Sequence, residues 1–160
     1  MNEQEQRAAV VAEAKTWLGT KYHHEGKIKG AGVDCLTLLA ASFEKPGLVP
    51  KVKLPHYPFD WHLHHGIERY MNGLLEYSVE VDGPPTRMPQ PADVVLWKIG
   101  RAFSHGALVI EWPMIIHAQV NVGCVLENVE NATWLYEKGE TGPDKGTMRP
   151  VKFFMLKEWN

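Results

Sequence analysis

The sequence contains only two cysteines, Cys35 and Cys124, among its 160 residues. Two cysteines can form at most one bridge, so a disulfide scaffold of the kind that holds small secreted domains together is not expected. A cysteine that no scaffold needs is either a small buried packing residue or a group available for chemistry. The setting of each cysteine along the chain must therefore decide between these two roles.

Long apolar runs and an excess of one charge are also lacking. The hydrophobic stretches are short and interrupted, and none approaches the roughly 18 apolar residues of a membrane-spanning helix. Lys and Arg number 17 against 19 Asp and Glu, which leaves no overall basic field for nucleic acid or anionic lipid. Residues 1–17 lack the basic start and apolar block of a secretory signal. We expect synthesis in the cytoplasm, no nucleic-acid binding and no membrane insertion.

What is present indicates one globular α+β domain over residues 1–160. Hydrophobic residues make up 44% of the chain and charged residues 22%, a balance typical of a folded domain of this length. Helical periodicity comes first, β-branched and apolar strand patterns come later, and a proline- and aromatic-rich excursion at 46–77 separates them. We predict helices at 4–18, 34–45 and near 66–77, and antiparallel strands at 93–98, 105–111, 114–119, 122–128 and 151–156.

Cys35 stands at the start of a predicted helix, in the sequence GAGVDCLTLLAA. The partial positive charge and free N–H groups of a helix N-terminus favour a thiolate with a lowered pKa and can hold an oxyanion. Asp34 is suited to cap this helix. The alternative is that Cys35 is simply a small buried hydrophobe. Cys124 lies inside a strand pattern, so we predict that it packs in the core.

A cysteine nucleophile needs a base, and two histidines lie in adjacent predicted strands. If residues 111–113 form a three-residue loop, Ala107 faces His117, and His105 and His117 share one face of the sheet. A two-residue loop would instead place them on opposite faces. On one face, His105 would accept the thiol proton and His117 would orient its ring. Alternatively, His117 is a core histidine with its hydrogen bonds satisfied.

The remaining histidines raise the question of a metal site. They lack the i, i+4 pairing of HExxH, and no CxxC or acidic partner stands at a ligand-like spacing. We therefore predict no metal and interpret them as solvated or substrate-lining. They are His23, His24, His56, His62, His64 and His65.

The ordered set GVDC, PADVVLW, SHGALVI and IIHA resembles the NlpC-type cell-wall cysteine peptidases, which have a papain-like fold. The start WLGTKYHH and the aromatic insert resemble the versions that tailed phages and gene transfer agents carry at the tail tip. The resemblance covers roughly residues 12–155. It implies Cys35 as nucleophile, His105 as base and His117 as orienting residue. It also implies that Tyr22 lines the oxyanion site and that Asp34 helps to recognise the substrate's amino end.

The resemblance further implies a thiol endopeptidase that needs no cofactor and cleaves peptidoglycan stem peptides, at the bond from the γ-carboxyl of D-glutamate to diaminopimelate. It places the protein on a phage-like tail tip, with tail or hub proteins as partners. Three residues depart from the common pattern: Leu36 and Thr37 replace a small pair, and Lys21 replaces a proline. Two alternatives stay open, a structural tail-tip protein that no longer hydrolyses the wall, and a thiol amidase or acyl transferase.

Overall fold

The first helix begins where its sequence supplies a cap. In the computed structural model, which describes residues 1–136 and 146–160, α1 spans Glu3–Lys15. The side chain of Asn2 accepts a hydrogen bond from the Glu5 N–H, and the Glu5 carboxylate accepts one from the Asn2 N–H, both at 2.9 Å. This reciprocal pair satisfies two of the free N–H groups at the helix start. Val10 and Ala14 are fully buried and give the helix its apolar face.

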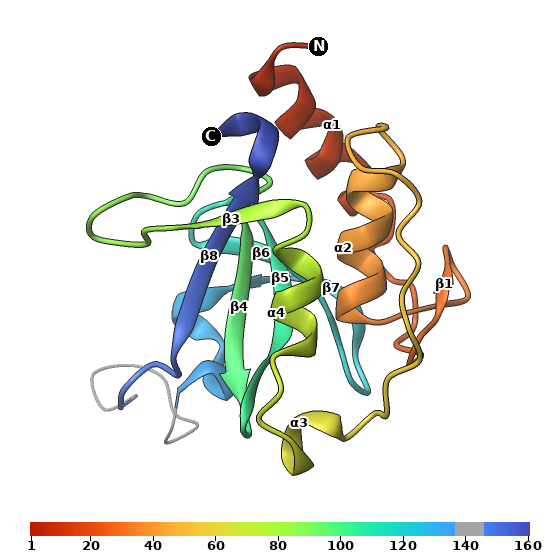
Figure 1. Ribbon diagram of the computed structural model, residues 1–160, viewed down its shortest axis with the longest axis vertical. Helices are drawn as coiled ribbons and strands as arrows, with labels where there is room; N and C mark the ends of the chain where they lie inside the picture. Colours follow the sequence, from red (N-terminus) through yellow and green to blue (C-terminus); the bar gives the residue numbers. More distant parts are fainter. Residues whose placement is uncertain (137–145) are drawn as a thin grey trace.

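The second helix, α2, spans Cys35–Glu44 and is almost wholly buried after its first turn. A short hairpin leads into it, formed by β1 (Lys27–Ile28) and β2 (Gly32–Val33). The chain then runs along the outside of α2 and forms two short helices, α3 (Trp61–His64) and α4 (Arg69–Leu74). Figure 1 shows α1 and α2 together on one side, α4 in front of the sheet and α3 at the end of the molecule opposite the two termini.

In the described residues, the main sheet has six antiparallel strands in the order β3-β8-β4-β5-β6-β7. The strands β4 to β7 form the predicted meander, and β8 returns to lie between β3 and β4. The bounds are β3 Ser78–Val81, β4 Val94–Ile99, β5 Ala102–Glu111, β6 Met114–Gln119, β7 Gly123–Asn128 and β8 Val151–Leu156.

The sheet buries apolar side chains on both faces. On one face, Leu96, Leu108 and Ile116 pack with α1 and α2 through residues such as Leu38. On the other face, a second cluster lies beneath two 3-10 segments that follow β7, Val129–Asn131 and Thr133–Leu135. A third 3-10 segment, Lys157–Trp159, follows β8, and its Trp159 packs in the first cluster. Because strand side chains alternate, residues 105 and 117 belong to the second face.

The α+β class and the strand meander are as the sequence predicted. Among the helices and strands, those missed are the two short hairpin strands β1 and β2, the strand β3, which pairs along β8, and the helix α3. The third predicted helix is shorter than 66–77, and the first ends at Lys15 rather than residue 18. Cys124 is 1% exposed, which confirms its predicted place in the core. Among the described residues, no helix has the length and apolar character to cross a bilayer.

Candidate active site

Cys35 is the first residue of α2, and Asp34 caps that helix as predicted. The Asp34 carboxylate accepts a hydrogen bond from the Thr37 N–H at 2.8 Å, and the Thr37 hydroxyl accepts one from the Asp34 N–H at 3.0 Å. The Thr37 side chain is buried in this cap, at 2% exposure, and does not line the cavity, whereas Leu36 does. The Cys35 thiol points to β5, where Sγ donates to the backbone oxygen of Ser104 at 3.9 Å.

The two histidines of adjacent strands do share one face and bond to each other. Nε2 of His105 lies 2.9 Å from Nδ1 of His117. Of the two loop lengths that the sequence left open, the structure has the two-residue one, because Glu111 pairs with Met114. A bulge between Val109 and Glu111 adds the residue that restores the predicted register. This is why a two-residue loop does not send the histidines to opposite faces.

Two further side chains surround the histidine pair. The indole ring of Trp134 stacks on His117, with centroids 5.3 Å apart, and meets His105 edge-on at 4.6 Å. Glu127 from β7 brings Oε2 within 2.9 Å of Nε2 of His117, close enough for an ion pair although not aligned as a hydrogen bond. His117 is fully buried, so this carboxylate and His105 are its polar surroundings in the described structure.

A strap formed by residues 54–60 lies against Asp34. The Tyr57 hydroxyl donates to Oδ2 of Asp34 at 2.5 Å, and the Glu25 N–H donates to the same oxygen at 2.8 Å. The Glu25 carboxylate accepts from the Tyr57 N–H at 2.9 Å, and Nε2 of His24 lies 2.7 Å from the Tyr57 backbone oxygen. Asp34 is 2% exposed. Its predicted contact with a substrate amine therefore requires the strap to move.

A cavity of about 690 Å³ brings the predicted site residues together. Tyr22, Asp34, Cys35 and His105 all line it, while His117 lies behind His105. Much of the remaining wall is apolar and comes from α2 and from the insert, residues 46–77, which includes α4. It includes Leu36, Leu39, Phe43, Val52, Leu54, Trp61, Tyr70 and Leu74.

The predicted lowering of the Cys35 pKa is wrong for this arrangement. Burial raises the pKa of the thiol to about 12, and the nearby charge of Asp34 adds to the rise. The Gly106 N–H and the Tyr70 hydroxyl act in the opposite direction without overcoming it. Burial lowers the pKa of His105 to about 3, and His117 adds to this. Both groups keep part of their surface open to the cavity, but at neutral pH they rest as thiol and neutral imidazole.

Tyr22 stands where the resemblance placed it, at the cavity wall near the nucleophile. Burial raises its pKa well above the ordinary value, with smaller contributions from Cys35 and Asp34. The hydroxyl therefore stays protonated and is available as a hydrogen-bond donor. Its ring meets Phe59 of the strap edge-on at 6.4 Å. Its role in holding an oxyanion stays a prediction.

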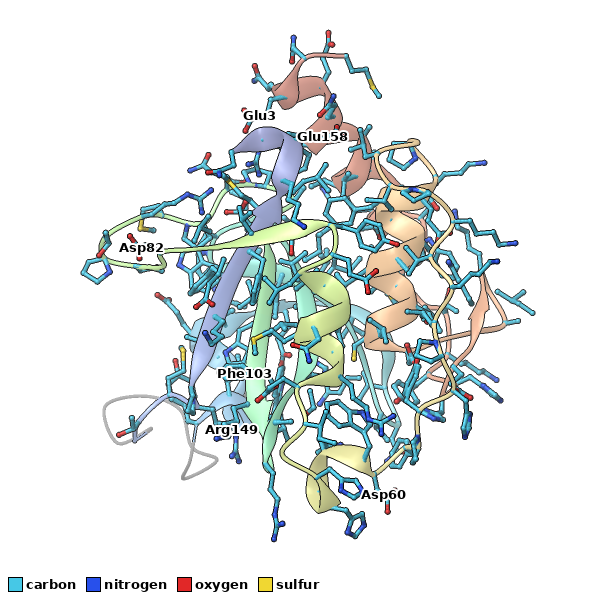
Figure 2. All side chains as sticks on the ribbon, in the orientation of Figure 1. Glu3, Asp60, Asp82, Phe103, Arg149 and Glu158 are labelled. Carbon is cyan, nitrogen blue, oxygen red and sulfur yellow. The ribbon has the colours of Figure 1, made fainter. Side chains whose placement is uncertain are left out.

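The other histidines go to separate partners. Nδ1 of His56 lies 3.0 Å from the Glu25 carboxylate, and Nε2 of His64 lies 2.9 Å from the Asp60 carboxylate. Figure 2 shows Asp60 beside α3, at the far end from Glu3 and Glu158. Within residues 1–136 and 146–160, no three His, Cys, Asp or Glu side chains gather as metal ligands would.

The sequence suggested for Tyr57 only a possible place in a lid over the groove and suggested no role for Tyr70, Glu127 or Trp134, although all four lie at the site. Tyr70 of α4 donates to the Cys35 backbone oxygen at 3.2 Å. The position of Glu127 could have been predicted from strand pairing, because pairing β6 with β7 places Glu127 on the same face of the sheet as His117. The two tyrosines come from the insert, whose irregular pattern gave no register.

Comparisons with solved structures agree on the fold. The NlpC/p60 domain of the peptidoglycan hydrolase SagA is 18% identical, with a TM-score of 0.54 over 93% of this chain and 98% of that one. NlpC1 from Trichomonas vaginalis is 13% identical, with a TM-score of 0.57 over 95% of this chain and 44% of that one. An NlpC/P60 family protein from Bacillus cereus ATCC 10987 is 15% identical, with a TM-score of 0.57 over 91% of this chain and 39% of that one.

The chain thus spans less than half of the last two proteins but nearly all of the SagA domain. No curated protein sequence matches this one. The family model of the NlpC/P60 family matches residues 19–139, which include Cys35, both histidines of the pair and the insert. On that match, and on a fold that its solved members share, this chain belongs to the NlpC/P60 family.

Proposed function

We propose that this protein is a thiol peptidase that hydrolyses an amide bond in peptidoglycan stem peptides. The observation that carries the proposal is the placement of Cys35 and His105 in the wall of one cavity, with His105 hydrogen-bonded to a buried second histidine. A nucleophile, a base and a group that orients the base are what covalent acyl transfer needs. The name of the SagA structure, a peptidoglycan hydrolase, supports the choice of substrate.

The proposed chemistry starts from the neutral thiol and imidazole. The Cys35 thiol gives its proton to His105 as Sγ attacks the carbonyl carbon, which forms a carbon–sulfur bond and an oxyanion. The N–H groups at the start of α2 and the Tyr22 hydroxyl donate to that oxyanion. His105 then protonates the leaving amine. A water molecule deprotonated by His105 attacks the thioester, and the released acid leaves the thiol restored.

Within this proposal, the scissile bond joins the γ-carboxyl of D-glutamate to diaminopimelate, and Asp34 binds the free amino end of the stem. A buried carboxylate that already accepts several hydrogen bonds is chemically suited to an ammonium group once the Tyr57 hydroxyl withdraws. We place the protein at the tail tip of a phage-like particle, together with tail or hub proteins. That placement rests on the sequence motifs, and mass spectrometry of purified particles tests it.

The test of the activity is digestion of purified Gram-negative and Gram-positive peptidoglycan by the wild type and by Cys35→Ala, with fragments identified by mass spectrometry. We expect stem-peptide fragments from the wild type and none from the variant. Intact walls from both proteins, under conditions in which Cys35 can be alkylated, would contradict the proposal for the isolated protein. Cys124→Ala is the matched control, because it removes the other thiol, which is buried and does not line the cavity.

A second candidate is a thiol amidase or acyl transferase, and the apolar cavity wall favours it. Stem peptides carry carboxylates and amines, whereas α2 and the insert surround Cys35 with leucine, phenylalanine and tryptophan side chains. Such a wall suits an apolar acyl group. The two candidates differ in the intermediate on Cys35. Mass spectrometry of protein denatured during turnover would find a stem-peptide acyl group in one case and a fatty acyl group in the other.

A further inference from the structure

His117 has a second polar neighbour that the catalytic set Cys35, His105 and His117 does not include. One ring nitrogen, Nδ1, bonds to His105, and the other, Nε2, lies 2.9 Å from Oε2 of Glu127. The indole N–H of Trp134 donates to the same Oε2, also at 2.9 Å. Both nitrogens of a fully buried imidazole thus face defined partners, one of them an acidic side chain.

The sheet explains why Glu127 reaches this position. His117 pairs with Val125 across β6 and β7, and Ile115 pairs with Glu127. Residues two apart on a strand lie on the same face, so Glu127 sits diagonally beside His117. Trp134 then covers both, since its ring is nearly parallel to His117, at 24°, while its N–H holds the carboxylate. The rings have little room to turn over.

The donor and acceptor roles follow from the charge of the carboxylate. The contacts with His117 and Trp134 lower the pKa of Glu127 below its ordinary range, so at neutral pH it is ionised and can only accept. When the His117 ring carries a single proton, that proton belongs on Nε2, beside the carboxylate, which leaves Nδ1 as an acceptor. Nδ1 of His117 in turn accepts a proton from Nε2 of His105. The nitrogen of His105 left without a proton is Nδ1.

We propose that Glu127 is a positioning residue that sets the tautomers of both histidines, so that Nδ1 of His105 is the base for the Cys35 thiol. The inference rests on the proposed function for its catalytic meaning, but the tautomers themselves do not depend on it. When the S–H bond breaks and Nδ1–H forms, the electron pair stays on sulfur and His105 becomes a cation. The Glu127 carboxylate, one imidazole away, stabilises that charge through the hydrogen-bonded pair.

The experiment compares Glu127→Met, which removes the acceptor at similar size, with Glu127→Gln, which keeps an oxygen acceptor but not the charge. Glu130→Gln is the control, because Glu130 is an exposed acid close by in sequence. The first readout is ¹⁵N NMR of labelled histidine, which reports which ring nitrogen carries hydrogen. The second is the rate of Cys35 alkylation against pH. Asp34, Tyr22 and Tyr70 also face the thiol and are the same in every variant.

We expect wild type to show hydrogen on Nε2 of both His105 and His117, and Glu127→Met to lose that preference. Alkylation at neutral pH should fall about tenfold in Glu127→Met and less in Glu127→Gln, as is typical of residues that orient a catalytic histidine. Hydrogen on Nδ1 of either ring in the wild type would overturn the inference. So would a folded Glu127→Met with unchanged tautomers and alkylation.

The two proposals fail separately. If wild type leaves peptidoglycan intact yet shows the expected tautomers, the proposed substrate is wrong and the role of Glu127 stands. If wild type digests peptidoglycan and Glu127→Met keeps both wild-type tautomers, the role of Glu127 is wrong. If Glu127→Met does not fold, Glu127→Gln serves as the test, because loss of the charge alone is expected to slow Cys35 alkylation at neutral pH.

Discussion

Gly106 follows His105 in β5 and has no room for a side chain. A Cβ at this position would overlap the Tyr70 hydroxyl and press on a Leu39 methyl group. The hydroxyl is held there because it donates to the Cys35 backbone oxygen at 3.2 Å. Glycine at 106 therefore allows α4 to close over the start of α2, beside the nucleophile.

We expect Gly106→Ala to lower the free energy of unfolding by about 1–3 kcal/mol, as overpacking of a core does. Tyr70→Phe alone should cost about 1 kcal/mol, because it removes one hydrogen bond. The double variant should lose less unfolding free energy than the two single variants lose together, because Tyr70→Phe removes the hydroxyl oxygen that the alanine methyl group at position 106 would overlap. Urea denaturation measures all three. Strict additivity would show that Tyr70 is not what excludes a side chain at 106.

A prediction about pH follows from the buried His105 ring. Its pKa is about 3 in the folded protein and about 6.5 in an unfolded chain. Between these values the unfolded chain binds more protons, so the free energy of unfolding must fall as the pH drops from about 6.5 toward 3. The loss should be on the order of 1–3 kcal/mol, because partial exposure to the cavity weakens the effect.

Urea denaturation at pH 7 and pH 4 tests this when wild type is compared with His105→Gln. The variant should lose less stability on acidification than the wild type, whereas His64→Gln, at an exposed histidine, should behave like the wild type. An equal acid loss in wild type and His105→Gln would show that His105 is not held neutral by its surroundings.

At this scale the sequence indicated which residues meet but not their protonation. The glycine loop before Cys35 and the strand parity of His105 and His117 predicted a shared site. In the structure Cys35 and His105 line one cavity, and His105 bonds to His117. The helix start alone predicted a lowered thiol pKa. Burial of the thiol in the folded protein reverses that direction, and no local sequence pattern reports such burial.

Among the elements, the strap of residues 54–60 has the most direct consequence for substrate entry. Most of its residues are exposed, and it is fixed by the contacts of Tyr57 with Asp34, Glu25 and His24. Phe59 adds ring contacts to Tyr22 and His24. The strap therefore covers Asp34, the residue proposed to bind the substrate amine, and a few polar contacts hold the strap in place.

We expect Tyr57→Phe to loosen the strap while leaving the helices and sheet unchanged. Cys35 alkylation at pH 8 should become several-fold faster, because a hydrogen bond to a charged group is lost and the thiol gains access to solvent. Limited proteolysis should also cut first within the strap. His64→Ala is the control, since His64 is exposed and forms an ion pair with nearby Asp60, outside the contacts that fix the strap. An alkylation rate unchanged by Tyr57→Phe would show that the strap does not limit access.

The regular elements were predictable from local pattern and the insert was not. Strand alternation fixed β4 to β8, and the Asp34–Cys35 start fixed α2. The strand β3 was missed because its sequence SVEV is short and its stability comes from pairing with β8. The short helix α3 was missed because a four-residue helix has no period to detect; it is placed by the buried Trp61.

At the level of the whole molecule, a buried carboxylate joins parts of the chain that lie far apart in sequence. Asp93, fully buried just before β4, accepts hydrogen bonds from Arg7 at 2.9 Å and from Arg87 at 2.6 Å. Arg7 comes from α1, and its guanidinium also lies 4.1 Å from the ring centre of Trp159. One cluster therefore connects the N-terminal helix, the connector before β4 and the C-terminal end.

This cluster closes the fold around the site, because α1 packs on α2 and α2 carries Cys35. Asp93→Ala would leave two guanidinium groups without their shared carboxylate, one of them on a side chain that is only 9% exposed. Removing one partner of a buried ion pair typically costs about 3–5 kcal/mol, because the charge that remains is buried and uncompensated. The result should be a much lower urea midpoint with an unchanged dependence on urea concentration.

The matched control is Lys152→Ala, which breaks the more exposed pair with Glu80 between β8 and β3. Exposed pairs contribute about 0–1 kcal/mol, so this variant should unfold close to the wild type. Similar small losses from both variants would show that Arg7 finds enough compensation in Glu3 and the Pro91 backbone oxygen. A large loss from Asp93→Ala alone would show that the stability of the fold depends on this contact between α1 and the residue before β4.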